Sequence, residues 1–374
     1  PTFRLTGRET ASPRGRLHAM SAVGEGVVEV DDTFASIIDF CLGCRACEPV
    51  CPGLVPFGRT LEGTRAEIDA QIPGRSRRHR WAVGTALGSR FLMRLGGVAL
   101  SIAQTLGLTR FAPRKYRRVS SGLRRLRGRP KSSIGHAGGP GDSGTVGLLA
   151  GCIQDEWFRP VNQTAIALLE MAGYMVVVPE RQTCCGALAA HDGKAEAAER
   201  FQTRNADAFG GYDNVVATAA GCSAHLADYR WMGHQPETLD VTVAVARAIE
   251  DGRLPRISGS NGPIAIQDPC HLRHAQRVVA EPRAVLTAAG YDVVEIDEVG
   301  LCCGAAGLYT VLQPEASDQL GSQKADQVRS TGVNKVASAN PGCEMQLRSH
   351  LEAAYDIKHP IEWYFEAITT PGIG

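Results

Sequence analysis

Cysteine spacing is the strongest chemical signal in this sequence of 374 residues. Four of its 12 cysteines, Cys41, Cys44, Cys47 and Cys51, form a C-x2-C-x2-C-x3-C run followed by proline. Thiolates at this spacing bind [4Fe-4S] clusters in ferredoxin-type loops. A zinc site or a chance group of buried thiols is the alternative interpretation. In two-cluster ferredoxins the fourth cysteine ligates the other cluster, so we expect Cys51 not to complete the cluster of the first three.

The other eight cysteines form two sets of four. Each set has a single cysteine, a Cys-Cys-Gly segment and another single cysteine: Cys152, Cys184, Cys185 and Cys222, then Cys270, Cys302, Cys303 and Cys343. The first three members of the two sets are 118 residues apart and the last members are 121 apart, which indicates an internal duplication. In a reducing compartment such clustered thiols are more often metal ligands than disulfides. We expect two copies of one unit that face each other.

Histidines close to these cysteines are weaker candidates. His225 follows Cys222 by three residues, and His271 directly follows Cys270. A hydrogen-bonded or surface role is commoner for such histidines, and the position equivalent to His225 in the second copy is Gln346, a poor ligand. We therefore leave both histidines out of the ligand set. No residue is assigned a catalytic role, and no glycine-rich dinucleotide motif follows a strand.

The predicted elements explain why cysteines so far apart could meet. Short apolar runs predict strands at 145–149, 174–178 and 215–218 and again at 263–267, 293–296 and 335–338, with a helix at 162–171. Strands that alternate with helices form parallel sheets, and the loops at the carboxyl ends of their strands converge. Each predicted strand is followed by a cysteine. Gly186 and Gly304 would let the backbone approach a cluster closely.

Charge is distributed unevenly. The chain has 40 Lys and Arg against 39 Asp and Glu, but residues 70–141 contain 16 basic residues and no acidic one. Basic clusters at 75–80, 114–118 and 124–131 flank apolar stretches at 81–87, 91–95 and 98–108, a pattern typical of amphipathic helices on an anionic membrane leaflet. A solvated linker and a docking surface for an acidic subunit are alternatives. Nucleic-acid binding is disfavoured because no recognition fold accompanies the charge.

Targeting signals are weak. The longest uncharged apolar stretch, 95–109, has 15 residues, too few to cross a bilayer. No apolar leader or cleavage site is recognisable at the N-terminus, so we expect a cytoplasmic protein. The acid-free basic segment adds the expectation of a peripheral position on the inner face of the membrane. The segment 135–144, GHAGGPGDSG, predicts a flexible linker.

The motifs together resemble the iron-sulfur subunit family of glycolate oxidase (glycolate dehydrogenase), within the cysteine-rich CCG-domain proteins that include heterodisulfide reductase subunits. The resemblance runs nearly end to end. It rests on SPRGRLHAM (12–20), CLGCRACEPVCP (41–52), LLAGC (148–152), CCGA (184–187), AAGC (219–222), QDPCHLRHAQ (267–276), LCCGAAG (301–307) and ANPGC (339–343). It implies that all 12 cysteines are metal ligands, with [4Fe-4S] in the ferredoxin-type loop and further iron-sulfur clusters in the repeats. It also implies FAD-binding partner subunits that oxidise glycolate and an electron path toward membrane quinone.

The resemblance also predicts the organisation of the chain. We expect an α/β protein: a small helical ferredoxin-like domain (1–74), a basic helical connector (75–144) and two parallel α/β cysteine-rich domains (145–258 and 259–374). Family members carry two ferredoxin runs. The first residues, Pro1-Thr2-Phe3, resemble the stretch after the last cysteine of the first run, so we expect the chain to be truncated at its N-terminus.

Alternative functions remain at this stage. The electron donor could be lactate or glycerol 3-phosphate, because the partner's pocket selects it. A heterodisulfide-reductase-like catalytic subunit is disfavoured because each repeat ends in a single cysteine where those enzymes have CxxC. Structural zinc modules are the non-redox alternative.

Overall fold

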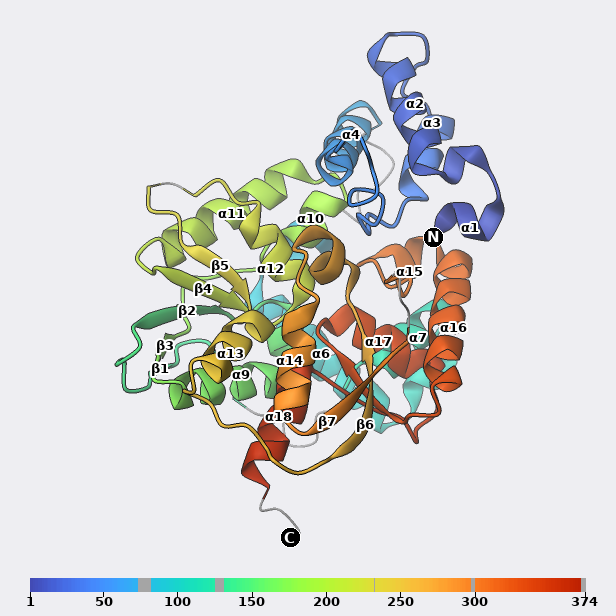
Figure 1. The fold of residues 1–374 in the computed structure, drawn as a ribbon. Coiled ribbons are helices and arrows are strands. Elements are labelled where there is room, and N and C mark those ends of the chain that lie inside the picture. Colours follow the sequence, from blue (N-terminus) through green and yellow to red (C-terminus); the bar gives the residue numbers. More distant parts are fainter. Residues whose placement is uncertain (73–81, 125–130, 232, 297–299, 371–374) are drawn as a thin grey trace.

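The computed structural model describes residues 1–72, 82–124, 131–231, 233–296 and 300–370 (Figure 1). The N-terminal residues form helices that lie on top of a larger body built from two sheets (Figure 1). These helices are α1 (Thr2–Thr6), η1 (Glu9–Ala11), α2 (Pro13–Gly24), α3 (Asp32–Asp39) and α4 (Phe57–Gln71). They enclose a small apolar core around Phe34, Ile38 and Leu61. This N-terminal helical region carries the ferredoxin-type loop between α3 and α4.

The first repeat forms a five-stranded sheet with the order β1-β3-β2-β4-β5. Its four longer strands are parallel, as predicted: β2 (Thr145–Leu149), β3 (Met175–Val177), β4 (Asn214–Ala217) and β5 (Glu237–Asp240). The connecting helices are α8 (Ile153–Trp157), α9 (Arg159–Met171), α10 (Ala187–His191), α11 (Ala195–Phe209), α12 (Ala220–Ala227) and α13 (Val241–Glu250). The three strands predicted from the sequence agree with β2, β3 and β4 within one residue at each end.

The second repeat forms a four-stranded parallel sheet with the order β7-β6-β8-β9. Its strands are β6 (Gly262–Gln267), β7 (Tyr291–Glu295), β8 (Lys335–Ser338) and β9 (Asp356–Lys358). Its helical elements are η4 (His271–Ala275), α14 (Ala280–Ala288), α15 (Tyr309–Leu312), α16 (Pro314–Ser330), α17 (Pro341–His350) and α18 (Pro360–Thr369). The duplication is therefore structural as well as sequential, because β2, β3, β4 and β5 correspond to β6, β7, β8 and β9.

A single apolar core joins the two repeats. Helices α9 and α13 of the first repeat pack against α14 and α18 of the second, and all four lie side by side in Figure 1. The buried residues of this core include Leu168, Val245, Val285 and Tyr364, each essentially inaccessible to solvent. Burial of such side chains is the main stabilising term of a fold. The two repeats are therefore halves of one folded body.

The predicted flexible linker at 135–144 was wrong in part. Residues Ala137–Gly138 form the edge strand β1, which pairs antiparallel with β3. The amide of Gly135 donates to the Val178 carbonyl (2.9 Å), and the amide of Val178 donates to the His136 carbonyl (2.8 Å). Glycine is required here for conformation, since Gly139 has φ +106° and a Cβ would lie 2.1 Å from the Tyr174 carbonyl oxygen. Composition indicated flexibility, but the ladder bonds to β3 fix the segment.

The basic connector contains the π-helical turn η2 (Ala82–Ala86), α6 (Arg90–Thr105), η3 (Leu108–Phe111) and α7 (Arg114–Gly122). Within the described residues, no helix has both the length and the apolar character needed to cross a bilayer. The predicted basic cluster at 75–80 lies outside the described residues, as does most of the cluster at 124–131. Arg124 is described: it donates to Glu344 of α17 (2.6 and 2.8 Å) and to Glu362 of α18 (2.6 and 2.7 Å). This nearly buried ion group ties the connector to the second repeat.

Candidate cluster-binding site

The four cysteines of the first repeat meet at the carboxyl edge of its sheet. Cys152 follows β2, the Cys184-Cys185 pair follows β3, and Cys222 lies in the first turn of α12 after β4. The Sγ atoms of Cys152 and Cys184 are 3.5 Å apart, and those of Cys185 and Cys222 are 3.1 Å apart. Residues separated by up to 70 positions thus form one continuous group of thiols, as the strand pattern predicted.

The second repeat reproduces this arrangement in the same order. Cys270 contacts Cys302, the adjacent Cys302 and Cys303 contact each other, and Cys303 contacts Cys343. Contact with Cys302 and burial raise the pKa of the Cys270 thiol well above its usual range. Contact with Cys184 and burial do the same to the pKa of Cys152 in the first repeat. The two sites are equivalent in chemistry and in connectivity.

The glycine of each Cys-Cys-Gly segment has a conformational role. Gly186 and Gly304 have φ +85° and +87°, which other residues rarely adopt. A Cβ on Gly304 would lie 2.7 Å from Leu320 Cβ and 2.8 Å from the Ser317 carbonyl oxygen, so the segment also packs closely on α16. The nearest side chains include His225 at Gly186 and Gln346 at Gly304. This confirms that His225 and Gln346 occupy equivalent positions in the two repeats.

Polar groups hold the first-repeat thiols in place. The side-chain amide of Asn205, on α11, donates to the Cys184 carbonyl (2.9 Å) and to the Tyr229 hydroxyl (3.1 Å). The Tyr229 hydroxyl in turn donates to the Cys185 carbonyl (2.5 Å). Asn205 and Tyr229 are both buried. They satisfy the backbone of the Cys-Cys pair without contributing a ligand, and the sequence analysis did not identify them.

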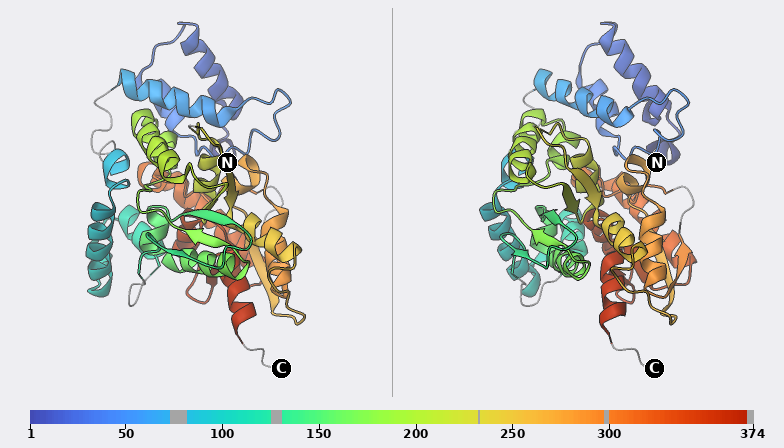
Figure 2. Two further views of the ribbon diagram at one scale, coloured as in Figure 1. Left: turned by 90° about the vertical axis from the view of Figure 1, so that its left-hand side faces the viewer. Right: turned by 60° about the vertical axis from the view of Figure 1, so that its left-hand side comes forward.

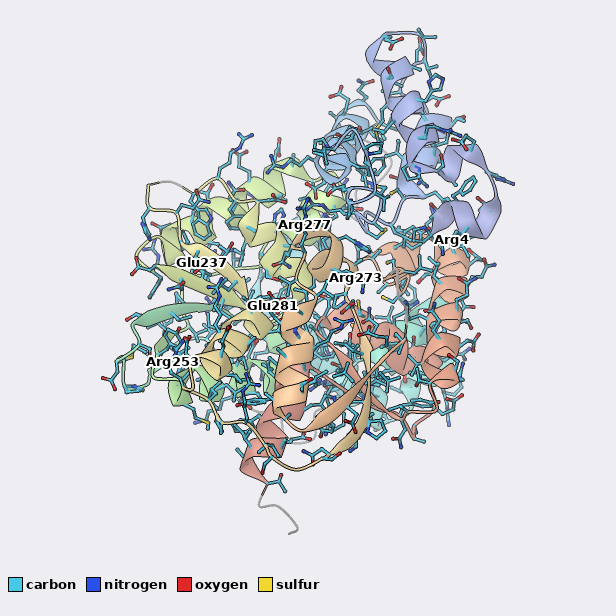
Figure 3. The ribbon with its side chains drawn as sticks, viewed as in Figure 1. Arg4, Glu237, Arg253, Arg273, Arg277 and Glu281 are labelled. Atoms are coloured by element: carbon cyan, nitrogen blue, oxygen red, sulfur yellow. The ribbon has the colours of Figure 1, made fainter. Side chains whose placement is uncertain are left out.

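Ion pairs fix the loop that carries Cys270. Asp268, two residues earlier, accepts from Arg273 (2.6 Å) and from Arg283 of α14 (3.0 Å). Figure 3 shows Arg273 and Arg277 at the η4 turn, above the strands of the second sheet. Arg277 is one of four non-glycine residues with positive φ (60°) among the described residues. The loop is therefore held in one conformation by charge as well as by packing.

The ferredoxin-type loop lies directly against the second repeat. Cys41 and Cys44 are buried, whereas Cys47 and Cys51 are half-buried. Cys44 packs in one apolar cluster with Leu42, Cys302 and Tyr309. Burial, then the neighbouring Cys270 thiol, raises the pKa of Cys44 to about 12. The separate assignment of Cys51 to another cluster stays a prediction.

The same region meets the first repeat through polar contacts. Glu62 of α4 pairs with His191 of α10 (2.6 Å), and Arg65 donates to the His191 carbonyl (2.5 Å) and to the Cys41 carbonyl (2.7 Å). Asp69 of α4 pairs with Lys194. Burial raises the pKa of Glu62, but the hydrogen bond to His191 and the nearby charges of His191, His225 and Arg45 together leave that pKa below its usual value. These contacts position the loop over both repeats.

One cavity connects the three groups of cysteines. It has a volume of about 580 Å³ and is lined by nine of the 12 cysteines: Cys41, Cys152, Cys184, Cys185, Cys222, Cys270, Cys302, Cys303 and Cys343. His191 and His271 also line it, with ring centroids 5.0 Å apart. Burial lowers the pKa of His225 to about 4, so this histidine is neutral. Nine of the 12 predicted ligands thus converge on one cavity.

The donor set fits iron-sulfur clusters. Buried thiols whose pKa is raised are unstable as isolated thiolates, and bound iron would supply the compensating positive charge. Within the described residues, no three Cys, His, Asp or Glu side chains are arranged around a point that suits a single metal ion. The thiols instead extend in a row through each repeat, which suits a group with several metal atoms better than a zinc ion.

Comparison with known proteins agrees with this geometry. The family described as "Cysteine-rich domain" matches residues 146–227 and 264–348, one match for each repeat. A probable glycolate oxidase iron-sulfur subunit from Bacillus subtilis is 31% identical over 94% of this chain and 86% of its own length. The chain belongs to the glycolate oxidase iron-sulfur subunit family.

Further relatives lie in and beyond this family. The glycolate oxidase iron-sulfur subunit of Escherichia coli is 26% identical over 98% of this chain and 91% of its own length. Lactate utilization protein A of Bacillus cytotoxicus is 25% identical over 55% of this chain and 91% of its own length. Iron-sulfur clusters are therefore the cofactors of this glycolate oxidase iron-sulfur subunit family member, in agreement with the prediction from cysteine spacing.

Proposed function

We propose that this chain is the electron-transfer subunit of a glycolate-oxidising complex and that its 12 cysteines are the cluster ligands. The observation that carries the proposal is that nine cysteines, from the ferredoxin-type loop and from both repeats, line one cavity, and that Cys44 of the loop packs against Cys302. When bound, iron-sulfur clusters supply one-electron transfer. The residues of the chain hold the ligands, exclude water and, through burial and hydrogen bonds near sulfur, set the reduction potential.

The oxidation of glycolate itself takes place on a partner in this proposal. Hydride abstraction from a 2-hydroxy acid needs a flavin or nicotinamide, and the sequence has no dinucleotide-binding motif. FAD-binding subunits therefore deliver electrons to this chain, and the chain passes them toward membrane quinone from a peripheral position at the inner face of the membrane. The relatives named as glycolate oxidase iron-sulfur subunits support this assignment.

The division into a ferredoxin-like domain, a connector and two cysteine-rich domains is part of the proposal. The shared core of α9, α13, α14 and α18 supports one modification, that the two cysteine-rich domains fold together. Lactate is the second candidate donor, favoured by the similarity to lactate utilization protein A. Donor choice resides in the partner's pocket and does not alter the role of this chain.

The test begins with iron and acid-labile sulfide counts on anaerobically purified chain. Iron and sulfide in comparable amounts are expected, and zinc without sulfide would contradict every redox role. The complex with its flavin subunits is then mixed with glycolate or lactate under anaerobic conditions, and bleaching of cluster absorbance is followed. Bleaching by glycolate supports the assignment, while bleaching by lactate alone replaces the donor and leaves the electron-transfer role intact.

A further inference from the structure

Helix α6 exposes a complete apolar face. Phe91, Leu95, Val98, Ile102 and Leu106 are 40% to 74% exposed. At about 100° per residue these five positions fall within an arc of about 80° on the helix. The face continues into the next turn, where Leu108 and Phe111 are also exposed. Soluble proteins scatter exposed apolar residues singly, so a contiguous stripe indicates a binding surface.

The opposite side of α6 is firmly packed. Gly97 is buried, Leu100 packs against the main core, and the side-chain amide of Gln104 donates to the Ser120 carbonyl (2.8 Å). Ser89 caps the N-terminus of the helix by accepting from the Leu92 amide. The exposed stripe is therefore presented by a fixed helix, and Figure 2 shows α6 along the outer edge of the body, below the N-terminal helical region.

The segment that carries the stripe has charge of one sign. Residues 70–141 contain no Asp or Glu, and Arg94, Arg110 and Arg117 are exposed beside the stripe or just after it. The Arg110 guanidinium also lies 4.7 Å from the centre of the Phe111 ring. An anionic leaflet attracts basic side chains and repels acidic ones, so an apolar stripe on an acid-free, arginine-rich segment is complementary to it. Aromatic residues at both ends of an apolar stripe suit the lipid headgroup boundary.

We infer that the exposed face of α6 and η3, defined by Phe91, Leu95, Val98, Ile102, Leu106, Leu108 and Phe111, binds an anionic lipid bilayer with the helix parallel to its plane. The apolar side chains enter the headgroup boundary while the arginines contact lipid phosphates. This inference deepens the proposed function, since it names the surface that would bring the chain to membrane quinone. It does not depend on cluster chemistry.

The test is vesicle co-sedimentation of the full cluster-loaded chain at low ionic strength. Vesicles of phosphatidylglycerol and phosphatidylcholine are compared with vesicles of phosphatidylcholine alone. We expect binding to the anionic vesicles only, and release by about 0.5 M salt, where the Debye length falls to a few ångströms. Absence of binding to anionic vesicles at low salt would overturn the inference.

Substitution locates the surface. L95Q combined with I102Q removes two exposed aliphatic side chains and should weaken vesicle binding at least about tenfold, because apolar side chains that leave water drive the binding. V27Q combined with V28Q is the matched control, since both valines are exposed but lie in the N-terminal helical region. Unchanged vesicle binding by the α6 variant would contradict the inference. The inference would also be contradicted if this variant still bound vesicles but no longer bound the flavin subunits. The exposed face of α6 would then be a protein interface.

Vesicle binding tests the lipid-binding surface, and cluster bleaching tests the electron-transfer role, so the two can fail independently. Vesicle binding requires no electron donor, and cluster bleaching by glycolate in solution requires no lipid. Failure of the first with success of the second removes the lipid surface alone. Far-UV circular dichroism and cluster absorbance of the variants establish that both are folded and loaded.

Discussion

The two repeats hold equivalent cysteines in the same order of contacts, yet their surroundings differ. The thiols of the first repeat are backed by the buried hydrogen bonds of Asn205 and Tyr229. Those of the second repeat contact the ferredoxin-type loop through Cys44 and Leu42. The duplication therefore produced two sites with the same four cysteines in different surroundings. We interpret the second as the site that exchanges electrons with the ferredoxin-type cluster.

The largest expected difference comes from removing one ligand in each repeat. C302S should lower glycolate-dependent electron transfer in the complex at least about 100-fold. Loss of a residue that only hydrogen-bonds to a metal ligand already lowers metal affinity or activity about 10- to 100-fold. C184S should have a smaller effect, because Cys44 contacts the second repeat. The measurement is turnover with an artificial acceptor, together with iron content. Equal losses would show that the two sites are equivalent in the electron path.

The unfolding free energy should depend on the ion group that joins Arg124 of the connector to the second repeat. R124M leaves Glu344 and Glu362 without their guanidinium and should cost about 3 to 5 kcal/mol of unfolding free energy, the usual effect of breaking a buried ion pair. R94M removes an exposed arginine of α6 and should change the unfolding free energy by less than about 0.5 kcal/mol. Urea unfolding measures both variants. A small effect of R124M would mean that the connector is not anchored through this group.

The N-terminal capping residues of two equivalent helices should change the unfolding free energy in opposite directions as pH rises. Asp240 caps α13 by accepting from the Thr242 amide (3.0 Å), and His359 caps α18 by accepting from the Ile361 amide (3.3 Å). Burial raises the pKa of Asp240 to about 6, with Glu281 adding to the rise. Burial lowers the pKa of His359 to about 3, with Glu362 and Arg124 acting in opposite senses.

The signs follow from proton binding. Between pH 4 and 6 the folded state holds more protons at Asp240 than the unfolded chain, so this residue makes stability fall as pH rises. At His359 the unfolded chain holds more protons, so stability rises with pH. Each slope amounts to roughly 3 kcal/mol over two pH units. The two slopes oppose each other in the unsubstituted protein, so D240N should make stability rise with pH and H359N should make it fall; unchanged slopes in urea titrations at several pH values would refute the assignment.

Removing one tyrosine hydroxyl in each repeat should have a smaller effect. Y229F removes one of the two acceptors of the Asn205 side-chain amide and the hydroxyl that donates to the Cys185 carbonyl, at a cost of about 2 kcal/mol. Y309F removes a half-buried bond to the Phe40 carbonyl (3.2 Å) and should cost about 1 kcal/mol. Thermal unfolding of the two variants is the measurement. The reverse order would place the tighter polar network in the second repeat.

The smallest effect is expected when the repeats are made alike. H225Q puts the glutamine of the second repeat into the first. Because His225 is neutral at pH 7, the substitution exchanges one uncharged polar group for another. The unfolding free energy should change by less than about 1 kcal/mol, and cluster loading should be unaffected. Loss of a cluster in H225Q would assign His225 to the ligand set, contrary to the sequence analysis.

Much of the fold could be predicted from sequence because its signals are local. The strands at 145–149 and 335–338 agree with β2 and β8 residue for residue, since short apolar runs between polar turns identify buried strands. The parallel-sheet geometry predicted that the four cysteines of a repeat would converge, and the duplication predicted that the same arrangement would recur about 118 residues later.

The docking of the ferredoxin-type loop could not be predicted in this way. Leu42 and Tyr309 meet across 267 positions, and neither lies in a periodic pattern that identifies its partner. The same holds for Asn205 and Tyr229, which act on backbone carbonyls rather than on sulfur. For α6 the apolar stripe was visible in the sequence, but only the packing of Leu100 and Gln104 shows that the stripe faces outward.

The shared core of the two repeats bears on the origin of the molecule. A polypeptide with one repeat would leave the inner faces of its two core helices, equivalent to α9 and α13, without a covering layer. A second identical chain would cover these faces symmetrically. In one chain with two repeats the halves need not carry the same sequence. The present chain uses this freedom, since one half presents a docking face for the ferredoxin-type loop while interior hydrogen bonds hold the thiols of the other.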